Sequence, residues 1–223
     1  MTRRQQGFTL IEIAIVLVII GLLLGGVLKG QELITSARVR NLISMQDGTK
    51  AAVFGFLDRY RALPGDYSQA SANINNVAAG ANGNNNGQVR SIVAGDVIDE
   101  HIASWDHLSK SGFINGNYTY NTTESPTTTP TNPFGSAVRY IFDAIYEGGA
   151  APGRHNLKTG ANISSDLMAE VDRKIDDGLA NGGNFRYSSY GSAAAGSGTC
   201  WVAATGNWQT QNPISNCGAA SLF

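Results

Sequence analysis

Residues 8–28 read FTLIEIAIVLVIIGLLLGGVL, and Glu12 is the one charged residue among these 21. A helix of this length spans about 31 Å, which matches the hydrocarbon core of a bilayer. Arg3 and Arg4 precede the apolar run, so the start of the chain is expected to stay cytoplasmic while the remainder is exported. The sequence therefore predicts one membrane-spanning segment near the N-terminus, followed by an exported head.

Three interpretations of this segment compete. A cleaved signal peptide fits poorly, because the run exceeds the usual apolar region of about 7–15 residues and no Ala-x-Ala-like site follows it. A plain signal anchor leaves Glu12 unexplained, since an isolated carboxylate in lipid costs a few kcal/mol and is usually functional. The third interpretation must explain Glu12, which either reaches water at the membrane edge or meets a cation. A cut between Gly7 and Phe8 would supply such a cation. It would be the new α-amino group, four residues before Glu12, of the same chain or of a neighbour.

The hexapeptide Gly7-Phe8-Thr9-Leu10-Ile11-Glu12 follows a short basic leader and opens the apolar helix. It resembles the cleavage and methylation motif of type IV pilins and type II secretion pseudopilins over residues 4–35. The resemblance implies cleavage after Gly7, N-methylation of Phe8, and a role for Glu12 in neutralising the N-terminal amine of an adjacent subunit during assembly. It also implies a structural filament subunit rather than an enzyme. Its head would be periplasmic before assembly, and its filament periplasmic or extracellular.

The partners implied by the resemblance are copies of this chain or related pilins, a prepilin peptidase and methyltransferase, and an inner-membrane assembly platform. Gly21 lies where many pilins have a glycine that loosens the helix, but the absence of Pro from residues 8–63 departs from the common major-pilin pattern. Two alternatives stay open: a minor or tip subunit with an adhesive or priming role, and a membrane-anchored binding module.

Composition and motifs favour no cofactor, metal or nucleic-acid partner. The chain has 16 basic and 17 acidic residues and a net charge of −1, which lacks the excess of basic charge typical of nucleic-acid binding. A nucleophile triad, a Walker loop and a zinc motif are all absent from the sequence.

Beyond the membrane segment the helix is expected to continue to residue 61, because no Pro occurs before Pro64. A stripe with steps of three and four supports this: Leu42, Met45, Thr49, Ala52, Phe56, Tyr60 and Leu63. A break near Gly48 or Gly55 is the alternative. The predicted organisation is a leader (1–7), a transmembrane and assembly half of the helix (8–28), an amphipathic half (29–61) and a head (62–223).

The head is expected to complete an α+β fold, in which the long N-terminal helix packs on a small antiparallel β-sheet. Residues 73–88 are rich in Asn and Gly and predict an exposed loop. Helices are predicted at 96–112 and 164–178, the second with Ser164 or Ser165 as its cap. Strands are predicted at 137–142, 185–190 and 199–203, with a short edge at 118–120.

Several polar residues of the head are candidates for chemistry. His101 and His107 are six residues apart, so they lie on different helix faces and are interpreted as solvated. The carboxylates of Asp172, Asp176 and Asp177 are interpreted as a solvated face or turn caps, with calcium or acid–base work as alternatives.

The only two cysteines of the chain, Cys200 and Cys217, lie beyond the export signal and are expected to form a disulfide that closes a C-terminal loop. Trp201 and Trp208 lie in this loop. They are interpreted as local packing, with glycan or surface binding as the alternative.

Overall fold

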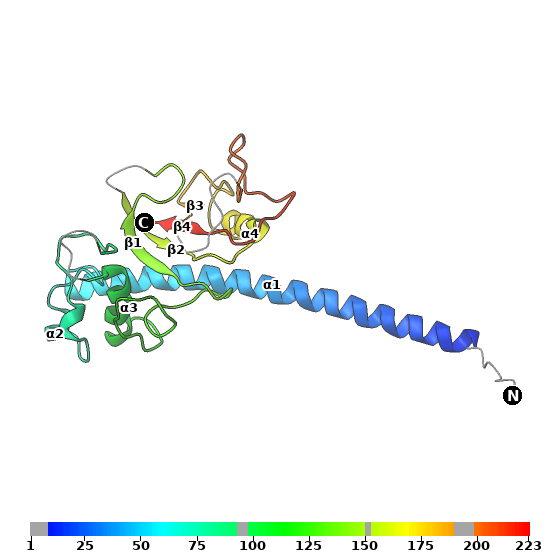
Figure 1. Ribbon diagram of the computed structural model, residues 1–223, viewed down its shortest axis with the longest axis horizontal. Helices are drawn as coiled ribbons and strands as arrows, with labels where there is room; N and C mark the ends of the chain where they lie inside the picture. The colour runs from blue at the N-terminus through cyan, green and yellow to red at the C-terminus, as the bar shows by residue number, and fades with distance from the viewer. Residues whose placement is uncertain (1–8, 93–97, 150–152, 190–198) are drawn as a thin grey trace, which may run out of the picture. The chain divides into compact units, whose positions relative to one another are not determined.

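The computed structural model describes residues 9–92, 98–149, 153–189 and 199–223. The chain divides into two compact units, Met1–Arg38 and Val39–Phe223. The long helix α1, Leu10–Tyr60, runs from the first unit into the second (Figure 1). The predicted α+β fold class is confirmed, because a long N-terminal helix is combined with a small antiparallel sheet.

Helix α1 passes Gly48 and Gly55 without a break, so the single predicted helix is correct between Leu10 and Tyr60. Within the second unit, four members of the predicted stripe are buried: Leu42, Thr49, Ala52 and Phe56. Three further residues widen the buried face: Val39, Gln46 and Val53. The stripe pattern therefore identified the correct face of the helix but not its full width.

In its described residues, the second unit contains three further α-helices, one short 3₁₀-helix and four strands. The helices are α2 (Ala70–Asn73), η1 (Ala79–Ala81), α3 (Glu100–Lys110) and α4 (Ser165–Ile175). The strands are β1 (Arg139–Asp143), β2 (Arg154–Lys158), β3 (Phe185–Tyr187) and β4 (Ala219–Leu222). They form one sheet in the order β1-β2-β4-β3, in which every neighbouring pair is antiparallel.

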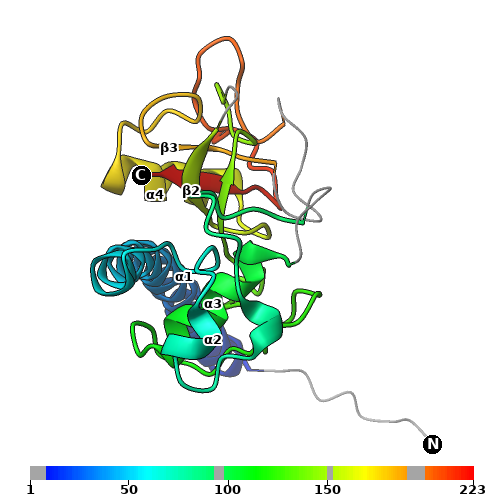
Figure 2. The ribbon, with the colours of Figure 1, turned by 90° about the vertical axis from the view of Figure 1, so that its left-hand side faces the viewer.

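The second half of α1 lies between two layers of the head. The sheet and α4 lie on one side of it and α2 and α3 on the other, as Figures 1 and 2 both show. One core cluster joins Val39 and Leu42 of α1 to residues of α4, β3 and the C-terminal loop. The other joins Val53 and Phe56 to α3, β1 and β2. Burial of this apolar surface on both sides of α1 is the main source of its stability in the head.

Strands β1 and β3 match predicted strands, whereas β2 and β4 were not predicted. The sequence of β2 is polar, yet Lys158 is only 1% exposed. Its ammonium donates to Asp143 Oδ1 at 2.9 Å and to the Ile145 carbonyl at 2.7 Å. Burial lowers the pKa of Lys158 to about 8, and Asp143 opposes that effect. A strand whose polar side chains are satisfied by residues distant in sequence has no apolar pattern to detect.

Two predicted strands and one predicted loop were wrong. Residues 118–120 form no strand, and Trp201 forms only an isolated bridge with Trp208 across a tight turn. The stretch 73–88 is not simply an exposed loop, because α2 ends within it, η1 lies inside it and three apolar side chains anchor it in the core: Ile74, Val77 and Ala81. These sparse anchors were hidden by the Asn- and Gly-rich composition around them.

Candidate functional site

The N-terminal end of α1 carries the main candidate site. Gly7 and Phe8, the predicted cleavage and methylation residues, lie outside the described residues. Thr9 precedes the first helical residue, and its backbone N–H and hydroxyl donate to Glu12 Oε2 at 2.8 and 2.7 Å. The Glu12 N–H in turn donates to the Thr9 hydroxyl at 3.3 Å. This reciprocal pair is a capping box, which satisfies donors at the helix start that have no partner within the helix.

The capping box gives Glu12 a local role that sequence reasoning missed. Its signal was present, because Thr9 and Glu12 have the three-residue spacing of a Thr-x-x-Glu cap. The carboxylate of Glu12 is exposed. Among the described residues, its hydrogen bonds are to Thr9, which directly precedes the first turn of the helix. It therefore lies at the exposed end of the helix, and its hydrogen bonds there are local.

The apolar segment that follows Glu12 has no partner within the described chain. Helix α1 is the one described helix that is long and apolar enough to cross a membrane, and none of its most apolar window is buried. Large side chains are exposed around its whole circumference, including Leu10 at 88% and Leu22 at 73%. Exposure of so much apolar surface to water is unfavourable, so this segment requires lipid or other apolar helices around it.

The polar end of the apolar segment is marked by an ion pair. Lys29 Nζ lies 2.6 Å from Glu32 Oε2, three residues along the exposed helix surface. Such surface pairs contribute little to stability, at most about 1 kcal/mol. Their importance here is positional, because charged side chains are expected at the membrane–water interface rather than in the lipid core.

In the head, the prediction that His107 is solvated was wrong. His107 is fully buried on α3, where Nδ1 accepts the Gly65 N–H at 2.9 Å and Nε2 lies 2.8 Å from the Ala81 carbonyl oxygen. This pairing fits a neutral ring with its proton on Nε2. Burial lowers the pKa of His107 to about 4. The ring thus joins α3 to the turn after α1 and to η1.

His101 is also buried, contrary to the prediction, and it belongs to a separate network. Its Nε2 lies 3.3 Å from Glu124 Oε1 and its Nδ1 lies 3.4 Å from the Ser91 hydroxyl. Glu124 also accepts hydrogen bonds from the guanidinium of Arg139. Burial would raise the pKa of Glu124, but the hydrogen bonds from His101 and Arg139 lower it to about 2. Through Glu124, which lies in the segment between them, this network ties α3 to β1.

The carboxylates of Asp172, Asp176 and Asp177 converge within 4.8 Å of one another. Asp172 is buried, so its assignment to a solvated face was wrong, while the turn-capping role is correct. Asp172 accepts the Gly178 N–H, and Asp177 accepts the Leu179 N–H at 2.8 Å. Burial raises the pKa of Asp172 to about 6 despite a hydrogen bond from the Trp208 indole. Backbone and indole donors therefore explain the cluster, and nothing further in the described residues points to an ion.

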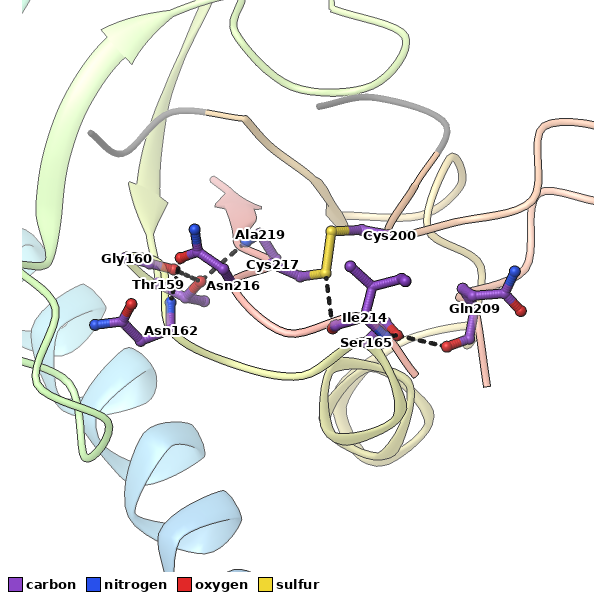
Figure 3. Close-up of a disulfide and its surroundings, with 10 residues drawn as sticks. All are labelled: Thr159, Gly160, Asn162, Ser165, Cys200, Gln209, Ile214, Asn216, Cys217 and Ala219. Atoms are coloured by element: carbon purple, nitrogen blue, oxygen red, sulfur yellow. Dashed lines mark hydrogen bonds between the residues drawn. A yellow bond between two sulfur atoms is a disulfide. The ribbon is translucent and has the colours of Figure 1, made fainter. Parts of the chain in front are cut away.

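Cys200 and Cys217, which were predicted to pair, form a disulfide with their Cα atoms 5.8 Å apart (Figure 3). Both are fully buried. The Cys217 N–H donates to the Ile163 carbonyl at 2.7 Å, just before α4. Two residues further on, the Ala219 N–H donates to the Thr159 hydroxyl at 2.9 Å. These hydrogen bonds hold the segment that leads into β4 against the residues before α4, and the disulfide joins the same segment to Cys200.

Trp201 and Trp208 are both buried in the cluster around the disulfide, as the packing interpretation predicted. The Trp208 indole N–H donates to Asp172 Oδ2 at 2.6 Å. The Trp201 indole N–H has no hydrogen-bond partner among the described residues. Neither ring is exposed enough to provide a flat binding surface.

Comparison with known proteins bears on the N-terminal segment. Residues 2–28 match the prokaryotic N-terminal methylation motif. No curated protein and no solved structure gave a significant match to the chain. The match covers the start of α1 with its capping box and does not extend into the head.

Proposed function

We propose that this chain, which carries the N-terminal methylation motif of type IV pilins and pseudopilins, is a structural subunit of a filament. In this proposal it is made as a prepilin and anchored in the inner membrane by the apolar part of α1. A prepilin peptidase cuts after Gly7 and Phe8 is methylated. An inner-membrane platform then adds the subunit to copies of itself or to related pilins.

One observation carries the proposal. Glu12 is the single carboxylate at the start of an apolar helix segment, and none of the most apolar window of that helix is buried in the structure. Removal of residues 1–7 creates an amine at Phe8, one residue before the capping residue Thr9. In an apolar environment a carboxylate and an ammonium attract strongly, and separation of the pair leaves two unsatisfied charges. Glu12 of one subunit can therefore exchange its hydrogen bonds to Thr9 for the amine of the next subunit. This charge pair stabilises the correctly stacked arrangement of the helices.

Close packing of the apolar helices supplies the rest of the driving force for assembly in this proposal. Helices in lipid associate through close packing and polar contacts rather than through a hydrophobic effect. Glycines at positions 21, 25 and 26 have no atom within 4 Å of the place where a side chain would begin. They leave room on α1 for the close approach of a neighbouring helix.

Two substitutions of Glu12 separate the charge-pairing role from the capping role. Glu12→Gln keeps a side chain that suits a capping box but removes the charge, whereas Glu12→Val removes both. We expect both variants to lose filaments, as measured by the amount of subunit in sheared filaments relative to the membrane fraction. Normal filament yield from Glu12→Gln together with a loss in Glu12→Val would leave only the capping role and refute charge pairing.

A further inference from the structure

We infer that the head has a binding site for a small, uncharged saccharide in the pocket between the second half of α1 and the loop after α3. The pocket has a volume of about 550 Å³, which is within the usual range for small-molecule sites. All its lining residues belong to the unit Val39–Phe223. This inference concerns the single subunit and does not depend on filament assembly.

The chemistry of the pocket wall selects the class of ligand. No Asp, Glu, Lys, Arg or His is among the described residues that line it. An ionised ligand would therefore lose its hydration without gaining a counter-charge. The side-chain amides of Asn41 and Asn115 line the pocket and offer both donors and acceptors to sugar hydroxyls. The Thr49 hydroxyl donates to the Met45 carbonyl at 2.8 Å, so it is left as an acceptor.

Aromatic rings provide the apolar part of the wall. Phe113 and Tyr118 line the pocket and are half-buried, so their rings are partly accessible. A pyranose ring has an apolar C–H face and a polar edge of hydroxyls. Aromatic side chains beside amides complement both features at once. A purely apolar ligand would instead leave the amide groups unpaired.

Trp105 of α3 also lines the pocket, and it carries an unpaired donor. Trp105 on α3 is 1% exposed, and its indole N–H has no hydrogen-bond partner among the described residues. Buried donors are paired in the great majority of cases, and an unpaired one costs about 1–3 kcal/mol. The N–H itself is buried, so a ligand oxygen can pair with it only if the wall of the pocket shifts. The indole of Trp105 is thus a reporter beside the pocket, and the class of ligand rests on the shape and the wall.

The test uses the full chain in lauryldimethylamine oxide, because a detergent with a sugar headgroup would compete for the pocket. The probes are N-acetyl-D-glucosamine, D-galactose and D-glucose, with the anionic N-acetylneuraminic acid as the charged comparison. The readout is the NMR shift of the Trp105 indole N–H, assigned by its loss in Trp105→Phe. At least one neutral sugar is expected to shift this signal with saturable, millimolar affinity, and the anionic sugar to bind more weakly.

A matched pair of variants locates the site. Asn115→Ala removes a pocket amide and is expected to weaken binding about three- to tenfold, the usual effect of one neutral hydrogen bond. Asn117→Ala changes an exposed amide two residues away that does not line the pocket, and it should bind as the wild type does. The inference is overturned if no neutral sugar shifts the Trp105 signal, if the anionic sugar binds more tightly, or if Asn115→Ala binds normally.

Discussion

The Nδ1 atom of His107 accepts a hydrogen bond from the backbone N–H of Gly65 at 2.9 Å, which links α3 to the turn that follows α1. Gly65 has a φ of +92°, and a side chain there would meet the Glu100 carbonyl oxygen at 2.2 Å. The turn thus needs glycine for both its conformation and its close approach to α3. A neutral, fully buried imidazole holds the joint between the long helix and the rest of the head.

Acid is expected to weaken this joint. The pKa of His107 is lowered to about 4 by burial, whereas the unfolded side chain titrates near its usual value of 6.5. As the pH falls from 6.5 to 4, the unfolded chain takes up a proton that the folded chain resists. The His107 contribution to the free energy of unfolding therefore declines by at most about 3 kcal/mol.

Denaturation of the full chain at several pH values, compared with His107→Gln, measures this contribution. His155 has a pKa lowered in the same direction, while Asp172 has a raised pKa and acts in the opposite direction. Both groups remain in the variant and cancel in the comparison. The stability difference between wild type and variant should shrink as the pH falls, and a constant difference between pH 7 and pH 4 would contradict the assignment.

Two glycines of α1 form a second test. A Cβ at Gly55 would lie 2.8 Å from the ring of Phe113, whereas a Cβ at Gly48 would meet nothing within 4 Å. Gly48→Ala should raise the free energy of unfolding by about 1 kcal/mol through helix propensity. Gly55→Ala should lower it by about 1–3 kcal/mol, because the ring must shift. Chemical denaturation compares them, and equal stabilisation by both would show that α1 does not pack on Phe113.

The two buried tryptophans beside the disulfide form a third matched pair. Trp208→Phe removes the indole donor to Asp172 and leaves a buried carboxylate oxygen unpaired, so it should lower the free energy of unfolding by about 2 kcal/mol beyond the change in packing. Trp201→Phe removes an N–H without a described partner and should have the smaller effect. A larger loss in Trp201→Phe would contradict the assigned hydrogen bond.

Removal of the disulfide is expected to destabilise the head. Cys200 and Cys217 are 17 positions apart, and a loop of this size is worth about 3 kcal/mol in the chain-entropy model. The double substitution to Ser should lower the free energy of unfolding by about that amount, measured by denaturation under non-reducing conditions. The reduced wild type serves as the comparison and should behave as the variant does; no change on reduction would mean that the bridge contributes nothing.

The N-terminal half of the fold was accessible from sequence because its signals are local. The apolar run, the absence of Pro and the stripe at helical spacing all lie within one continuous element. The same holds for α4, where Met168 and Val171 are buried and Ser164 occupies the N-cap position, although its hydroxyl makes no capping hydrogen bond. Amphipathic periodicity needs no knowledge of distant residues.

The polar interior of the head could not be predicted in this way. His107 is paired by the backbone of Gly65 and Ala81, which lie 42 and 26 positions away. Lys158 in β2 is paired by Asp143, and Asp172 is bonded to Trp208 36 positions away. A polar side chain is expected to be solvated unless its partner is known, and these partners meet only in the folded chain.

Mass spectrometry of the mature N-terminus, applied to subunits from sheared filaments or from the membrane fraction, tests the central claim most directly. We expect a chain that lacks residues 1–7 and begins with N-methylated Phe8, so that the new amine lies beside Thr9 and Glu12. A chain that keeps Met1, or one cut at any other position, would contradict the account.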